Sequence, residues 1–350
     1  MSETPGYMYE LKVTVVSLKL GIDEYTLPIG LREVTWGASS FKINHRPFYF
    51  RGFGRHEDSN IRGKGLDLPL FARDYNLIKW IGANSYRTSH YPYADELMDF
   101  ADKNGIVIID EAPAVALDHF EKPLLDHHLD VMTELVNRDK NHPSVIMWSV
   151  GNEPRSYENS SGQYFKTVAS HTRALDSTRP VTLVCNANYA SDHASQHFDV
   201  VAINRYFGWY SDPGHIELIH RQMLADLRDW HNARGKPVMV TEYGADTVAG
   251  LHMEPSMVFT EEYQVELMKE NFKAFDDARA EGWFIGEHIW NFADFMTKQE
   301  PRRVAGNKKG IFTRERQPKM SAHLLRGRYW KLAQEIDGKE TTDSKSIFLL

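Results

Sequence analysis

Residues 144–154 read SVIMWSVGNEP, and this stretch decides the fold class. Its first part, Ser144–Val150, is a short and mainly apolar run without polar alternation, which is typical of a strand buried on both faces of a sheet. Polar groups follow at once in Asn152 and Glu153, and Pro154 is suited to the first turn of a helix. A buried strand that ends in polar residues and leads into a helix indicates a βα unit of a parallel sheet.

Seven other runs of the same kind bring the total to eight. They are Phe48–Phe53, Ala83–Ser89, Ile106–Asp110, Val181–Asn186, Val200–Asn204, Val238–Glu242 and Phe284–Trp290. Segments with helical spacing lie between them, of which the clearest are Leu70–Ile81, Ala94–Asn104 and Glu261–Ala280. Eight strand and helix units predict an α/β protein, a closed (β/α)8 TIM barrel with a short β segment before it.

An open doubly wound sheet is the alternative, but it should carry a glycine-rich phosphate turn after its first strand. The stretch GFG at residues 52–54 is too short to be that turn. Before the barrel, Tyr9, Leu11 and Val13 alternate with polar residues, which predicts strands with a hairpin turn near residues 21–23. We therefore divide the chain into a β segment (1–36), a catalytic barrel (37–335) and a C-terminal tail (336–350).

The composition excludes several classes of protein. The chain has 350 residues, 41 basic and 48 acidic side chains and a formal charge of −7, so general binding of nucleic acid or another polyanion is not expected. A single cysteine, Cys185, rules out an internal disulfide framework and indicates a small core residue. No apolar stretch is long enough to cross a membrane, and the first residues lack a signal-peptide pattern, so we expect a cytoplasmic protein.

Polar residues follow seven of the eight predicted strands. One such residue alone is commonly a helix cap, but seven groups together indicate a site, because the C-terminal ends of barrel strands meet at one mouth. The groups are GRHED at 54–58, RTSH at 87–90, DE at 110–111, GNEP at 151–154, NRY at 204–206, EYG at 242–244 and WN at 290–291.

Two carboxylates, Glu153 and Glu242, end the fourth and seventh strands and are candidates for a general acid and a nucleophile. Strands four and seven lie across the mouth of a barrel, so the two side chains could flank a bound sugar. A separation of about 5–5.5 Å would favour retention and about 6.5–9.5 Å inversion. The structural alternatives are a helix N-terminal acid for Glu153 and a buried ion pair for Glu242.

Four motifs resemble the β-glucuronidases of glycoside hydrolase family 2, and the similarity runs from about Gly6 to Glu335. They are WSVGNEP at 148–154, TEYG at 241–244, WNFADF at 290–295 and GNKKG at 306–310. The resemblance implies hydrolysis of terminal β-D-glucuronides by double displacement. Glu153 would be the acid/base, with a raised pKa, and Glu242 the nucleophile that forms a covalent glycosyl-enzyme.

The same resemblance nominates sugar contacts. Asn152 suits the 2-hydroxyl, Tyr206 matches the family tyrosine beside the nucleophile, and Asn204, Tyr210 and His56 match neighbouring sugar contacts. As a lone histidine, His56 could equally be structural. Arg87 could donate to Glu242 and lower the pKa of that carboxyl, although a structural ion pair accounts for it equally well.

Recognition of a uronic acid is expected at residues 302–316, which hold six basic residues and one acid. The resemblance assigns Asn307 and Lys309 to the substrate carboxylate, with Arg303 assisting and Trp290 forming a wall. A solvated basic loop is the structural alternative.

The resemblance implies a β-glucuronide, small or oligosaccharide, as the binding partner, with no cofactor and no metal. We interpret the stretch DHH at 126–128 as a solvated helix face.

Family members carry a sugar-binding sandwich and an immunoglobulin-like domain before the barrel, and residues 1–36 resemble the last strands of the latter. Without the sandwich an acidic sugar contact is lost, so a truncated or engineered barrel with little or no activity stays an alternative. A neutral-sugar β-glycosidase and a non-catalytic sugar-binding barrel are others, and homo-oligomer formation is left open.

Overall fold

A computed structural model describes residues 5–300 and 303–338. Its centre is a closed barrel of eight parallel strands that follow one another in chain order, and β6 pairs with β13 to close the ring. The strands are β6 (Phe50–Gly54), β7 (Ser85–Arg87), β8 (Val107–Glu111), β9 (Val145–Asn152), β10 (Val181–Cys185), β11 (Val200–Asn204), β12 (Val238–Glu242) and β13 (Phe284–Ile289). Each overlaps one of the eight predicted runs, so the (β/α)8 TIM barrel is confirmed.

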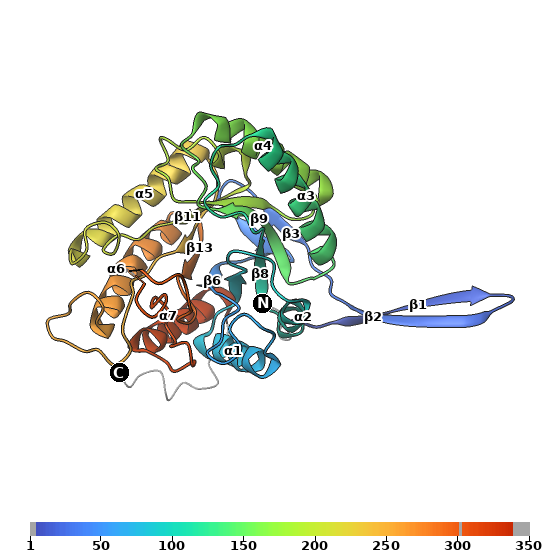
Figure 1. The fold of residues 1–350 in the computed structure, drawn as a ribbon, viewed down its shortest axis with the longest axis horizontal. Coiled ribbons are helices and arrows are strands. Elements are labelled where there is room, and N and C mark those ends of the chain that lie inside the picture. The colour runs from blue at the N-terminus through green and yellow to red at the C-terminus, as the bar shows by residue number, and fades with distance from the viewer. Residues whose placement is uncertain (1–4, 301–302, 339–350) are drawn as a thin grey trace.

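Helices surround the barrel (Figure 1). They are α1 (Leu68–Ile81), α2 (Asp95–Asn104), α3 (Lys122–Asp139), α4 (Asn159–Leu175), α5 (Ile219–Arg234), α6 (Glu261–Ala280) and α7 (Met320–Asp337), with short 3-10 helices at Ser195–His197 and Ile216–Leu218. Helix α6 has the predicted bounds, and Gly105, in the left-handed conformation, caps the C-terminal end of α2. Helix α1 begins two residues earlier than predicted, because the Asp67 side chain accepts a hydrogen bond from the Leu70 N–H and caps the helix there.

Two apolar layers hold the barrel together. The larger lies between strands and helices and includes Trp148 and Cys185, both fully buried. The smaller fills the barrel interior, where Met239 packs with Val34 and Phe41 from a three-stranded antiparallel sheet. That sheet, β3 (Val34–Trp36), β4 (Phe41–Ile43) and β5 (Arg46–Pro47), closes the end where the barrel strands begin, which leaves the other end open for a site.

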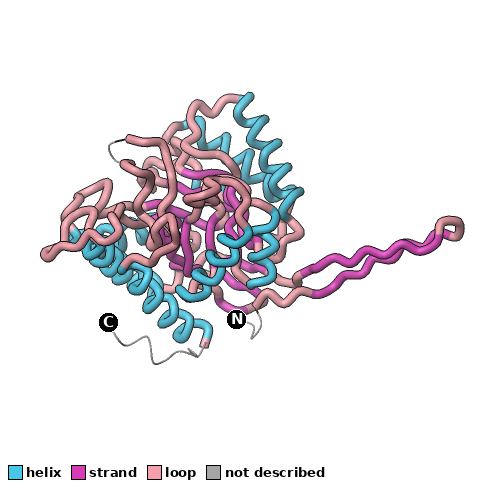
Figure 2. Tube along the Cα trace, turned by 60° about the horizontal axis from the view of Figure 1, so that its bottom comes forward, coloured by secondary structure: helices cyan, strands magenta, loops and turns pink. Residues whose placement is uncertain are grey.

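Strands β1 (Tyr9–Ser17) and β2 (Gly21–Ile29) form an antiparallel ribbon that projects away from the barrel (Figures 1 and 2). The predicted hairpin exists, but its turn was placed too late. Ser17 pairs with Gly21, so the turn occupies residues 18–20, and the pattern at 21–23 belongs to the second strand. The three-part division at residues 36 and 335 stays a prediction, and residues 339–350 of the predicted tail lie outside the described residues. None of the helices described is long and apolar enough to span a membrane.

Gly52 should be intolerant of a side chain. A Cβ atom there would lie 1.9 Å from the Ser85 carbonyl oxygen on the neighbouring strand, so Gly52→Ala must force β6 and β7 apart. We expect a loss of about 1–3 kcal/mol in the free energy of unfolding, measured by chemical denaturation.

Gly327 in α7 is the matched control, because a Cβ atom there would meet no atom within 4 Å. Gly327→Ala should stabilise the chain by about 0.5–1 kcal/mol, since alanine loses less backbone freedom on folding. A Gly52→Ala chain as stable as the parent would contradict the close approach of the two strands.

Candidate active site

A cavity of about 650 Å³ opens where the barrel strands end. Nine of the residues predicted for the site line it, whereas Arg87, His56 and Lys309 do not. The nine are Asn152, Glu153, Asn204, Tyr206, Tyr210, Glu242, Trp290, Arg303 and Asn307. The sequence therefore located the cavity, while the chemical roles assigned to these residues stay predictions.

Glu242 is the last residue of β12, and both of its carboxylate oxygens accept hydrogen bonds. Arg87 Nη2 donates to Oε1, and the Tyr206 hydroxyl donates to Oε2 over 2.6 Å. Arg87 is fully buried, and its Nη1 also donates to both oxygens of Glu111 at 2.8 Å. Arg87 is thus both the predicted partner of Glu242 and a member of a structural ion pair.

Glu153 follows β9 in the left-handed backbone conformation, with φ 49°, and its N–H donates to the Val184 carbonyl at 2.8 Å. Its Oε1 accepts from Asn204 Nδ2 at 2.8 Å and its Oε2 from Asn186 Nδ2 at 3.1 Å. Burial raises the pKa of the Glu153 carboxyl above the ordinary value of 4.5, and the charge of Glu242 raises it further. Glu153 is held by neutral amides, whereas Glu242 is held by a cation and a phenol.

Asn152 connects the surroundings of the two acids. Its Oδ1 accepts from Arg87 Nη1 at 3.3 Å and from Asn204 Nδ2 at 3.2 Å. The other end of the Asn204 amide is fixed because its Oδ1 accepts from Thr241 Oγ1 at 2.8 Å. A continuous set of hydrogen bonds therefore runs from Glu242 to Glu153 through Arg87, Asn152 and Asn204.

The residues predicted to bind a carboxylate lie together at one side of the cavity. Arg303 and Asn307 line it, whereas the Lys309 side chain is fully buried behind it. Lys309 Nζ donates to Asp246 Oδ2 at 2.5 Å and to the Tyr210 hydroxyl at 3.2 Å. Arg303 Nη1 donates to the same Asp246 oxygen at 3.1 Å, and Arg303 Nη2 bonds the Tyr210 hydroxyl.

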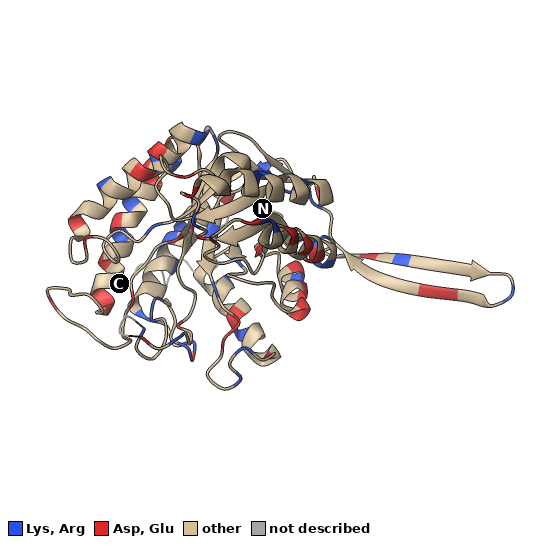
Figure 3. Ribbon diagram, turned by 45° about the horizontal axis from the view of Figure 1, so that its top comes forward, with Lys and Arg blue, Asp and Glu red and all other residues tan. Residues whose placement is uncertain are grey.

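Four of the six basic side chains at residues 302–316 pair with acidic residues from distant parts of the sequence, which partly offset the positive charge counted there. The pairs are Arg303 and Lys309 with Asp246, Arg314 with Asp58, and Arg316 with Asp74, while Arg302 lies outside the described residues. Basic and acidic residues are likewise interspersed over the molecule (Figure 3).

His56 lies behind the cavity rather than on its wall. Its ring centroid is 4.1 Å from that of Phe295 and 5.4 Å from that of Trp290, and its Nδ1 is 3.2 Å from the Tyr91 hydroxyl. Burial, together with the neighbouring groups His90, Lys64 and Arg87, lowers the pKa of His56 well below 6.5, so this ring is neutral at neutral pH. In this structure His56 supports the tryptophan that forms the wall.

Sequence reasoning gave no role to four residues that the structure places at the site: His90, Glu111, Asn186 and Asp246. His90 Nδ1 is 2.8 Å from Glu111 Oε1. Despite its burial, the pKa of Glu111 is lowered, because Arg87 and His90 favour the charged form. Glu111 and His90 stood in the predicted strand-end groups, which was a usable signal, but nothing in the sequence marked Asp246 as the partner of Lys309.

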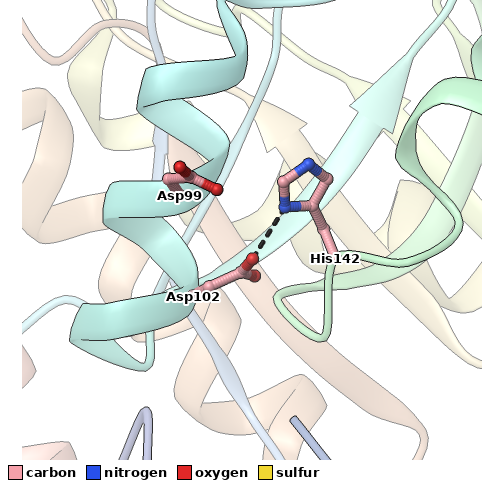
Figure 4. A group of neighbouring side chains, drawn as sticks. All are labelled: Asp99, Asp102 and His142. Atoms are coloured by element: carbon pink, nitrogen blue, oxygen red, sulfur yellow. Dashed lines mark hydrogen bonds and ion pairs between the residues drawn. The ribbon is translucent and has the colours of Figure 1, made fainter. Parts of the chain in front are cut away.

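One group of potential metal ligands occurs among the described residues, namely Asp99, Asp102 and His142 (Figure 4). Asp102 uses one oxygen for His142 Nδ1 at 2.7 Å and the other for the Ser144 N–H at 2.9 Å. Burial acts against protonation, but the hydrogen bond with Asp102 raises the pKa of His142, so we interpret the pair as a salt bridge.

The predicted solvated face at residues 126–128 is partly wrong. Asp126 is exposed and pairs with Lys122, but His128 is buried. The His128 ring lies 2.9 Å from the Tyr164 hydroxyl and 2.7 Å from the Val150 carbonyl oxygen. His128 therefore connects α3 to Tyr164 of α4 and to Val150 of β9, and burial lowers its pKa to about 4, so the ring is neutral at neutral pH.

Residues 34–334 match the sequence model described as "Glycosyl hydrolases family 2, TIM barrel domain". The chain belongs to glycosyl hydrolase family 2. The matched range contains the whole barrel and all the cavity-lining residues.

Curated relatives in the family include the β-glucuronidases of Mus musculus and Homo sapiens. Each is 52% identical to this chain over 341 residues, which is 97% and 96% of the chain respectively and 52% of each relative. The chain thus spans about half the length of the curated relatives it matches. A solved β-D-glucuronidase from Dictyoglomus thermophilum is 49% identical with a TM-score of 0.89, covering 93% of this chain and 58% of that one. A Bifidobacterium dentium β-glucuronidase complexed with coumarin-3-O-glucuronide is 44% identical with a TM-score of 0.88, covering 93% and 54%.

The Glu153 carboxyl should make stability depend on pH. Its pKa is higher in the folded chain, so its contribution to stability is fully present below the ordinary value of 4.5 and is lost as the pH rises through the raised value. Glutamine cannot ionise. The stability of Glu153→Gln relative to the parent should therefore be greater at about pH 8 than at about pH 4, as measured by chemical denaturation.

Glu134→Gln on the exposed face of α3 provides the control for the loss of one carboxyl group. An equal stability difference between Glu153→Gln and the parent at both pH values would show that the cavity does not raise the pKa of this carboxyl.

Proposed function

We propose that this chain is the catalytic barrel of a retaining β-glucuronidase, a glycosidase that hydrolyses the O-glycosyl bond of terminal β-D-glucuronides. One observation carries the proposal: Glu153 and Glu242 line the same cavity in contrasting surroundings, and Arg303 and Asn307 line it as well. The named relatives act as support, since the proteins that the chain matches over about half their length are β-glucuronidases.

In the first step Glu242 attacks the anomeric carbon while Glu153 gives its proton to the aglycone oxygen. The bond from the anomeric carbon to that oxygen breaks, and a glycosyl ester forms on Glu242. In the second step the ionised Glu153 takes a proton from water, the water oxygen attacks the same carbon, and Glu242 is released. The raised pKa of Glu153 suits a group that must be protonated first and basic afterwards.

The hydrogen bonds around Glu242 fit the role of a nucleophile. Arg87 fixes one oxygen, and Tyr206 fixes the other. Burial and the charge of Glu242 raise the pKa of Tyr206 well above 10, so the phenol stays protonated and keeps donating. We assign the contact with the sugar 2-hydroxyl to Asn152, which is anchored by hydrogen bonds with Arg87 and Asn204.

Recognition of the C6 carboxylate is proposed for Asn307, Arg303 and Lys309, with Trp290 as a wall. Arg303 on the cavity wall and Lys309 directly behind it favour a substrate that carries a carboxylate over a neutral sugar. The cytoplasmic location and any self-association remain predictions from the sequence.

The nucleophile assignment predicts the activity of one variant. The parent should hydrolyse aryl β-glucuronides, and Glu242→Gln should lower kcat by about 10⁴-fold or more, because an amide cannot form the glycosyl ester. Release of the aryl group, followed by absorbance, measures both rates, and Glu134→Gln should keep the parental rate. Residual turnover in Glu242→Gln close to that of the parent would contradict the assignment.

Specificity for the carboxylate should depend on Lys309. Lys309→Ala should lower kcat/KM for an aryl β-glucuronide by about 100-fold and leave the much slower β-glucoside rate nearly unchanged. Lys308→Ala removes a neighbouring positive charge and should change neither kcat/KM for the β-glucuronide nor the β-glucoside rate much. Equal losses on both glycosides in Lys309→Ala would indicate a structural role for the lysine instead.

A further inference from the structure

Asp246 is a buried acid at the point where the proposed nucleophile strand meets the carboxylate-binding loop. It follows Glu242 by four residues, and only 2% of its surface is exposed. Its Oδ2 accepts from Lys309 Nζ at 2.5 Å and from Arg303 Nη1 at 3.1 Å, and its Oδ1 accepts from the Lys308 N–H at 2.7 Å. Both oxygens are engaged by the loop that would bind the substrate carboxylate.

Lys309 is closed off from the cavity in this structure. Its side chain has no exposed surface, and its Nζ lies 4.9 Å from the ring centroids of both Trp209 and Tyr210. The Tyr210 hydroxyl bonds both Lys309 and Arg303, while the Tyr210 side chain is half exposed and lines the cavity. The Tyr210 hydroxyl thus occupies one donor of Lys309 and one donor of Arg303, the two groups proposed to bind a ligand carboxylate.

We propose that Asp246 is a positioning residue that holds Lys309 and Arg303 together and offsets one of their charges, so that a uronate binds the pair by displacing the Tyr210 hydroxyl. The inference rests on the proposed function. Asp246 offsets one of the two positive charges, so an arriving carboxylate meets a single net charge and a preformed pair of donors.

Once Asp246 has lost its charge, Lys309 should respond to a ligand carboxylate, which the lysine of a purely structural ion pair would not do. If Asp246 loses its charge, Lys309 is left buried without an anionic partner, and such a charge is costly. In Asp246→Asn, a bound ligand carboxylate is then the only anion that pairs with Lys309 and Arg303. The free energy of unfolding of this variant should therefore rise when a uronate binds, and a neutral sugar of the same shape should not have this effect.

The test uses Asp246→Asn with D-glucuronate as the probe and D-glucose as the matched ligand without a carboxylate. We expect Asp246→Asn to unfold at a lower temperature than the parent without ligand. Its Kd for D-glucuronate, measured by calorimetry, should be about tenfold smaller than that of the parent. D-glucose should bind both proteins equally.

The double variant Asp246→Asn with Lys309→Gln removes both charges and tests the cause. It should recover stability, because no buried charge is left unpaired, and it should lose the tighter binding of D-glucuronate. Equal affinity of the parent and Asp246→Asn for D-glucuronate, or tighter binding that survives in the double variant, overturns the proposal.

A crystal structure of the parent with D-glucuronate keeps the proposal testable if Asp246→Asn does not fold. The ligand carboxylate is expected to contact Lys309 in place of the Tyr210 hydroxyl, with Asp246 still bonded to Lys309. An unchanged bond between Tyr210 and Lys309 overturns it. None of these measurements needs turnover, so a chain that binds D-glucuronate in this way but hydrolyses nothing refutes the proposed catalysis alone.

Discussion

The buried guanidinium of Arg87 is the contact on which the site depends. It lies at the end of β7 and joins Glu111 at the end of β8, Asn152 at the end of β9 and Glu242 at the end of β12. A cation without exposed surface is stable only when acids surround it, and here two carboxylates do so. The position of Glu242 is therefore fixed by a group that the barrel cannot rearrange without leaving buried charges unpaired.

This contact accounts for the different surroundings of the two proposed catalytic acids. Glu242 is held by a guanidinium and a phenol, whereas Glu153 is held by two amides, and burial raises the pKa of the Glu153 carboxyl. Asn152 and Asn204 keep the two environments at a fixed spacing. A single set of hydrogen bonds thus connects the two carboxyl groups that the proposed double displacement uses.

The sequence predicted the barrel well because strands buried on both faces are visible as apolar runs, and polar residues after such runs can only meet at one end of the barrel. It misplaced the first hairpin turn, since residues 18–20 carry no stronger turn signal than 21–23. Charge was harder to predict. Lys309 belongs to a basic stretch, yet its partner Asp246 lies 63 residues earlier, and only the folded chain shows that the pair is buried. His128 was misjudged for the same reason, because packing of α3 decides which of its residues face the barrel.

The most direct test of the account is covalent trapping of the proposed nucleophile. Incubation with a 2-deoxy-2-fluoro-β-D-glucuronyl fluoride slows the second step of a double displacement more than the first, so the glycosyl ester should accumulate. Mass spectrometry of peptides should find one sugar on the peptide that contains Glu242, and none in Glu242→Gln. A sugar attached to a different residue, or turnover of an aryl β-glucuronide with inverted anomeric configuration and no attached sugar, would contradict the account.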